Sequence, residues 1–116
     1  MITAELLSQI SLFATLPEGE RASISSRAAD VRIRAGEYLL LEGQEPAFFG
    51  LLEGRIDVLK MLSGRDQRLA TYGPGDYFGE VPLLLGAPAI ASLRAIEPAR
   101  LMRLDRTDFL EMIAQC

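Results

Sequence analysis

The stretch RIRAGEYLLLEGQEPAFFGLLEGRIDVL, residues 32–59, decides the fold class of this chain. Its glycines separate short apolar runs, and each run has the length of an ordinary β-strand. At its start, Val31 and Ile33 alternate with Arg32 and Arg34, which is the spacing of a strand with one buried face. The stretch therefore predicts several short strands joined by turns.

The same pattern continues towards the C-terminus. Further short runs follow in RLATYG, ASLRAIE and ARLMRLD, and the polar segment LSGRDQ, residues 62–67, predicts the tip of a hairpin at Gly64. Many short strands separated by turn residues are typical of a β-roll or double-stranded jelly roll. We therefore expect a mainly β fold over residues 31–105. Solvated charges at a strand edge are expected at Arg100, Arg103 and Arg106.

Helices flank the predicted strands on the N-terminal side. Apolar residues recur at helical spacing between residues 3 and 10, and Pro17 suits the first turn of a second helix over residues 17–27. These helices, within residues 3–28, are expected to pack on the β-roll through the apolar side chains of Leu6, Leu7, Ile10, Leu12, Phe13, Leu16 and Ile24.

Two further helices are predicted in the second half of the chain. EVPLLLG indicates a short helix over residues 80–85 that ends at Gly86, and its three leucines are expected to pack. RTDFLEMIAQC indicates a C-terminal helix over residues 107–116 with Thr107 as its N-cap. Its core-facing positions are expected to be Phe109, Met112 and Ile113. Because this helix has no C-terminal stop signal, we expect the sequence to be the N-terminal part of a larger protein.

Length and composition fit one domain and exclude several classes of function. The 116 residues, 49% of them apolar, are enough to bury a core in a single domain over residues 1–116. The 12 basic and 16 acidic residues give a net charge of −4, and no basic patch of the kind that binds nucleic acid directly is present. The longest apolar run is far shorter than a membrane span.

The lack of histidine bears on catalysis and on metal binding. Histidine is the most common metal ligand and the most common general base, and the sequence contains none. No nucleophile is paired with a neighbouring base either, so we expect neither an enzyme nor a metal site. The one cysteine, Cys116, fits a reducing compartment. Since the N-terminus has no features of a secretory signal, we expect a cytoplasmic location.

The segment Gly79-Glu80-Val81 has the chemistry of a site for a small polar ligand. A glycine lets the backbone approach a ligand closely. The first amides of the following helix have no internal partners and favour an anion, and the Glu80 carboxylate accepts hydrogen bonds from sugar hydroxyls. This combination suits a small nucleotide. The same residues also fit a turn glycine and a carboxylate that caps its own helix.

Several motifs, in order, resemble the cyclic-nucleotide-binding domains of catabolite activators and protein kinase A regulatory subunits. YGPGDYFGEVPLLLGAPAIASLRA, residues 72–95, is similar to the phosphate-binding cassette of this family. Residues 32–59 are similar to its Ala/Pro-Gly turn, Glu-Gly and Glu-Gly-x-Ile/Val-x-Val pattern. The resemblance implies a regulatory module for cAMP or cGMP that controls an attached effector domain or a partner protein, and it is compatible with a homodimer.

The resemblance also implies a set of ligand contacts. Gly79, Glu80 and Val81 match the start of the cassette, where the family holds the ribose 2′-hydroxyl and the phosphate. The cassette's Pro-Arg-Ala-Ala segment is matched by Pro88, Ala89, Ile90 and Ala91. Ala89 therefore stands where the family places the arginine that pairs with phosphate.

The missing arginine weakens the expected site. Loss of a hydrogen bond to a charged group costs about 1.5–3 kcal/mol, or roughly ten- to a hundredfold or more in affinity for a cyclic nucleotide. If binding persists, we expect the backbone amides of residues 89–91 to contribute to it. Alternation along this strand places residues 89, 91, 93 and 95 inward and Arg94 outward, so Arg94 is not expected to replace the lost cation.

Two functions remain open from the sequence. The first is a sensor of a cyclic nucleotide or a related small ligand, with no other cofactor. The second is a degenerate member of the family that serves as a non-binding interaction or dimerisation domain. Ala89 is the residue that separates them, because it removes the phosphate contact and leaves the fold intact.

Overall fold

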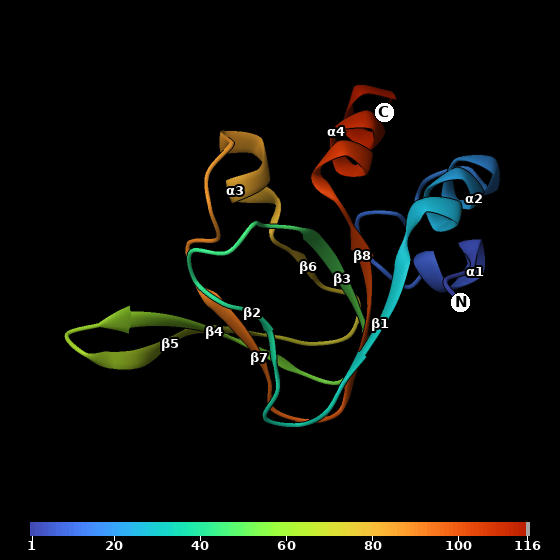
Figure 1. The fold of residues 1–116 in the computed structure, drawn as a ribbon. Coiled ribbons are helices and arrows are strands. Elements are labelled where there is room, and N and C mark those ends of the chain that lie inside the picture. Colours follow the sequence, from blue (N-terminus) through green and yellow to red (C-terminus); the bar gives the residue numbers. More distant parts are fainter. Residues whose placement is uncertain (116) are drawn as a thin grey trace.

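The computed structural model describes residues 1–115 as two four-stranded sheets with helices at one end (Figure 1). The helices are α1 (Ala4–Leu7), α2 (Glu18–Arg27), α3 (Glu80–Leu85) and α4 (Arg106–Gln115). The strands are β1 (Ala29–Ile33), β2 (Tyr38–Leu40), β3 (Phe48–Glu53), β4 (Ile56–Leu62), β5 (Arg65–Tyr72), β6 (Tyr77–Phe78), β7 (Ser92–Ala95) and β8 (Ala99–Leu104). The predicted mainly β jelly roll with flanking helices and a short helix in the cassette is confirmed.

Both sheets are antiparallel, with strand orders β1-β8-β3-β6 and β2-β7-β4-β5. In the first sheet β8 lies between β1 and β3, so that Phe48 is opposite Leu104. In the second sheet β4 pairs with both β7 and β5. The β4–β5 hairpin turns at Ser63 and Gly64, which have φ values of 52° and 77°. This confirms the predicted hairpin tip, because tight hairpin turns need positive φ.

Strand β3 is buried on both faces and separates the core into two layers. Phe49 and Leu51 point between the two sheets, where they pack with Ile56 and other apolar side chains. Phe48 points to the opposite side, and its ring centroid lies 5.1 Å from that of Phe109 on α4. Because successive side chains of a strand face opposite sides, a continuous apolar run such as FFGLL fits a strand covered on both faces. Helices α1, α2 and α4 supply the outer cover (Figure 1).

The last helix begins slightly earlier than predicted. Helix α4 starts at Arg106, and the amide of Phe109 donates to the carbonyl of Asp105 at 2.8 Å. Thr107 therefore lies inside the helix, and its prediction as the N-cap is wrong. Both Asp and Thr are good N-cap residues, so the local sequence did not distinguish them. Cys116, the last residue of the predicted helix, lies outside the described residues.

Several apolar residues predicted to pack are exposed. Leu12 is 38% exposed and Ile113 is 40% exposed, because each lies on the outer side of a segment that is covered on one face only. In α3, Leu83 is fully buried, whereas Leu84 and Leu85 are 56% and 73% exposed. A helix of six residues presents only part of its circumference to a core, so the prediction that all three leucines pack is wrong.

Arg100 is not a solvated charge at a strand edge. It lies on β8, in the interior of the first sheet, and its guanidinium donates to both carboxylate oxygens of Asp30 at 3.1 and 2.9 Å. The side chains of Arg100 and Asp30 are only 17% and 18% exposed. The hydrogen bonds from Arg100, together with the amino group of Met1, hold the pKa of the Asp30 carboxyl well below its ordinary value.

Candidate functional site

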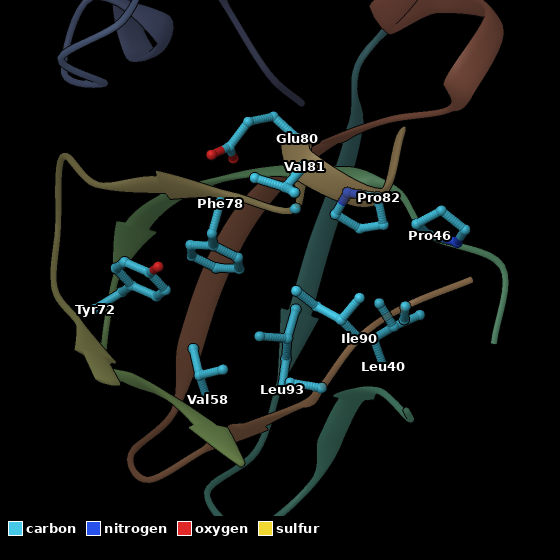
Figure 2. Close-up of a pocket in the computed structure, with 13 residues that line it drawn as sticks. Leu40, Pro46, Val58, Tyr72, Phe78, Glu80, Val81, Pro82, Ile90 and Leu93 are labelled. Atoms are coloured by element: carbon cyan, nitrogen blue, oxygen red, sulfur yellow. The ribbon is translucent and has the colours of Figure 1, made fainter. Parts of the chain in front are cut away.

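A cavity of about 140 Å³ lies between the second sheet and helix α3 (Figure 2). Its lining comes from strands β2, β4, β5, β6 and β7, from α3 and from the loop before β7. Most of these side chains are apolar, and among the lining residues within 1–115 Glu80 is the only one with a carboxylate. A concave, mostly apolar site with a few polar groups is the usual form of a small-molecule site.

All six residues predicted to contact a ligand lie in the lining of this one cavity. Gly79, Glu80 and Val81 reach it from the junction of β6 and α3. The other wall is formed by the loop before β7, with Ala89, Ile90 and Ala91. Ala89 and Ala91 are buried, whereas the side chains of Val81 and Ile90 are 48% and 56% exposed at the cavity mouth.

The rest of the lining is not recognisable as ligand contacts from the sequence. These residues are mostly apolar and come from several strands: Leu40, Pro46, Val58, Tyr72, Phe78, Pro82 and Leu93. Figure 2 shows Val58 and Leu93 at the end of the cavity away from Glu80. Inward alternation along a strand was the only available signal for them, and it does not indicate which inward residues meet a cavity.

Gly79 is required by the backbone at the start of α3. Its φ is +94°, in the region that side chains rarely adopt. A Cβ added there would lie 2.2 Å from the carbonyl oxygen of Ala47, which is far inside van der Waals contact. Glycine therefore allows the β6–α3 turn to pass directly over the start of β3. This turn sets the position of Glu80 at the cavity.

The polar end of the cavity is formed by Glu80 and Tyr72. Figure 2 shows the Glu80 carboxylate above the Phe78 ring, turned away from Val58 and Leu93. Within residues 1–115, the buried Oε2 atom of Glu80 has no hydrogen-bond partner. The Tyr72 ring stacks on Phe78 at 4.7 Å. Burial, and secondarily the carboxylates of Glu80 and Asp76, raise the pKa of the Tyr72 phenol.

Comparison with known proteins identifies the family. The family model described as the cyclic nucleotide-binding domain matches residues 30–116. This chain belongs to the cyclic nucleotide-binding domain family. It is 33% identical, over 107 residues, to the cAMP-dependent protein kinase regulatory subunit of Emericella nidulans. That match covers 92% of this chain but only 26% of the relative, so the chain spans about a quarter of the relative's length.

Solved structures of the family share the fold. The regulatory domain of Toxoplasma gondii PKA, in a co-crystal structure with cAMP, matches with a TM-score of 0.83 and 27% identity, covering 94% of this chain and 42% of that one. The catabolite activator protein of Thermus thermophilus matches with a TM-score of 0.80 and 29% identity, covering 90% of this chain and 50% of that one. The jelly roll and its cassette helix are therefore those of this family.

In this cyclic nucleotide-binding domain, the loop before β7 is tied to the neighbouring turn. The amide of Ala89 donates to the carbonyl of Gln44 at 2.8 Å, and the amide of Gly43 donates to the carbonyl of Ala89 at 2.8 Å. The Ala89 amide, one of the three expected to contribute to binding, therefore already has a backbone partner. Within the described chain, the amides of Ile90 and Ala91 donate to no other backbone group.

Two cations lie near the loop, and both have other partners. Lys60 Nζ is 2.8 Å from Glu42 Oε2 and 2.8 Å from the carbonyl oxygen of Ile90. This hydrogen bond from Lys60 lowers the pKa of the Glu42 carboxyl. Arg94 lies on the outer face of β7, over the Tyr38 ring. The predicted alternation is confirmed here, because residues 89, 91, 93 and 95 are buried and Arg94 is exposed.

None of the helices within residues 1–115 is long and apolar enough to cross a membrane. In the same residues, no group of three or more metal-ligating side chains comes together.

Proposed function

We propose that this chain is the small-ligand sensing module of a regulatory protein and that the cavity beside α3 holds a nucleotide-like ligand. The observation that carries the proposal is that all six residues matched to the family's cassette line one cavity. Glu80 supplies an acceptor for a hydroxyl group, and the apolar walls supply a surface for a flat ring. The chain itself has no catalytic role in this proposal.

The module acts on something outside the cavity in this proposal. Val81 lines the cavity, and the same helix presents Leu84 and Leu85 to the outside. A ligand in contact with Val81 therefore changes the environment of a helix whose outer face is free to contact an effector domain or a partner protein. The relatives named above support this role, because one is a kinase regulatory subunit and another is an activator protein.

Calorimetric titration tests the proposal. The chain is titrated with cAMP, cGMP, adenosine and guanosine, and we expect saturable binding of at least one of them. Glu80→Ala is expected to abolish that binding, whereas Glu97→Ala, at an exposed position outside the cavity lining, is expected to leave it unchanged. Absence of heat with all four compounds would refute the proposal.

A second candidate is an interaction domain that binds no small ligand. The observation in its favour is the exposed apolar surface of α3 and the following loop, formed by Val81, Leu84, Leu85 and Ile90, which are 48–73% exposed. Under this alternative, a partner protein covers these side chains. A cytoplasmic location and a single domain over residues 1–116 stay predictions under both candidates.

A further inference from the structure

We infer that the cavity takes an uncharged ligand with the shape of a ribonucleoside, namely a hydroxylated sugar joined to a flat heterocycle, and that it disfavours a phosphate. This inference rests on the proposed function, since it names the ligand class of the same cavity. It is carried by the charges, hydrogen bonds and exposure of the residues around that cavity.

The cavity has no positive charge to meet a phosphate. Neither lysine nor arginine is among the lining residues within the described chain, and Glu80 contributes a carboxylate. Ala89, buried at the place of the missing arginine, offers only a methyl group. A phosphate in this cavity would lose its hydration and face a like charge, and both effects disfavour an anion.

The nearest cations do not replace the missing arginine. Lys60 is held by the Glu42 carboxylate and by the Ile90 carbonyl, each at 2.8 Å. Releasing it would leave Glu42 without its ion-pair partner. Arg94 donates to the carbonyl of Gly36 at 3.1 Å on the outer face of β7, and the strand would have to turn over to bring it to the cavity.

The backbone around Ala89 is also partly closed to an anion. The Ala89 amide donates to Gln44 and its carbonyl accepts from Gly43. These two hydrogen bonds fix the loop against the turn at residues 43–44. An anion would therefore have to displace an existing hydrogen bond in order to use this amide, whereas a neutral ligand has no such requirement.

The polar end of the cavity is suited to a sugar. Glu80 is the carboxylate in the cavity lining. A carboxylate only accepts hydrogen bonds, so it suits a ligand group that donates them. Hydroxyl groups of a ribose are donors of this kind.

The opposite end and the mouth are suited to a flat heterocycle. Figure 2 shows Leu40, Ile90 and Leu93 away from the Glu80 carboxylate. The cavity has a volume of about 140 Å³. Ligand pockets usually have volumes of about 300 Å³ or more, so this cavity is smaller than usual. Part of the ligand must therefore lie at the mouth, where Val81 and Ile90 are about half exposed and gain apolar contact when covered.

Calorimetry with matched ligand pairs tests the inference. Adenosine is compared with cAMP, and guanosine with cGMP, because each pair differs by the cyclic phosphate. We expect the better nucleoside to bind the unmodified chain at least about tenfold more tightly than its cyclic monophosphate. We also expect its affinity to stay constant as the salt concentration is raised, since no ion pair is formed.

Ala89→Arg restores a cation at the cavity, and Ala89→Met is the control of similar length without charge. The arginine variant is expected to gain about tenfold or more in affinity for the cyclic monophosphate, whereas the methionine variant is expected to gain none. An equal gain in both variants would overturn the charge argument. If Ala89→Arg does not fold, the comparison of ligand pairs on the unmodified chain decides the matter.

The outcomes separate this inference from the proposed function. Tighter binding of the cyclic monophosphate than of its nucleoside by the unmodified chain overturns the inference and leaves the proposed function standing. Failure of all four compounds to bind overturns both.

Discussion

Replacing Gly79 by alanine tests whether the start of α3 depends on a glycine. The φ of +94° costs a residue with a side chain about 1–2 kcal/mol. The new Cβ would also lie 2.2 Å from the carbonyl oxygen of Ala47, which is a buried residue. Overpacking of this kind costs about 1–3 kcal/mol. We therefore expect Gly79→Ala to lower the free energy of unfolding by about 2–5 kcal/mol.

Gly43→Ala is the matched control for this variant. Gly43 has a φ of +88°, but nothing lies within 4 Å of an added Cβ, so only the backbone cost of about 1–2 kcal/mol is expected. Urea denaturation followed by circular dichroism gives both free energies, provided that the m-values stay equal. Equal losses of stability in the two variants would refute the reasoning, because the close approach to Ala47 would then contribute nothing.

Three further predictions concern stability and ionisation. At neutral pH, Asp30→Asn is expected to cost about 1 kcal/mol in urea denaturation. Because the pKa of Asp30 is lowered by Arg100, its contribution is present above the ordinary carboxyl pKa of about 3.9 and is lost as the pH falls through the lowered value. The difference between the two proteins should therefore shrink in acid, and a constant difference would contradict this account. Leu83→Ala is expected to cost about 2–5 kcal/mol, and Leu85→Ala less than about 0.5 kcal/mol, in the same assay; equal costs would contradict the burial of α3. In an ultraviolet pH titration, the tyrosine ionisation that is missing from Tyr72→Phe should occur above the ordinary tyrosine pKa of about 10. Ionisation at or below that pH would contradict the raised pKa of Tyr72.

The fold class was predictable because its signals are local. Glycines between short apolar runs define strands, and Gly64 in a polar segment defines a hairpin tip. The order of strands in the sheets is not local. Strand β8 lies between β1 and β3, which brings Arg100 beside Asp30 from 70 residues away. No pattern within β8 itself indicates this ion pair, so the prediction that Arg100 is a solvated edge charge is wrong.

The errors in the helices have a different origin. Asp105 and Thr107, at the start of α4, both suit an N-cap, and the helix begins directly after Asp105. In α3, the sequence specifies apolar residues on all sides, but only one side meets the core. The exposure of Leu84 and Leu85 follows from the position of the helix at the edge of the β-roll, which a sequence pattern does not contain.

The candidate site was partly predictable. The motif around Gly79 and the segment around Ala89 were matched to one cassette, and both line the same cavity. The rest of the lining is not predictable from the sequence because it depends on the register of five separate strands. Lys60 was also missed as a cation near the loop, although it follows the lining residue Val58 on the same face of β4.

The central claim is that the cavity beside α3 is the ligand site of this domain. The most direct measurement is a series of two-dimensional ¹H–¹⁵N spectra of the unmodified chain during titration with adenosine, guanosine, cAMP and cGMP. We predict saturable shifts of the amide signals of Gly79, Val81 and Ala91, with those of β1 unchanged. Spectra that do not change with any of the four compounds, or that change only away from the cavity lining, would contradict the claim.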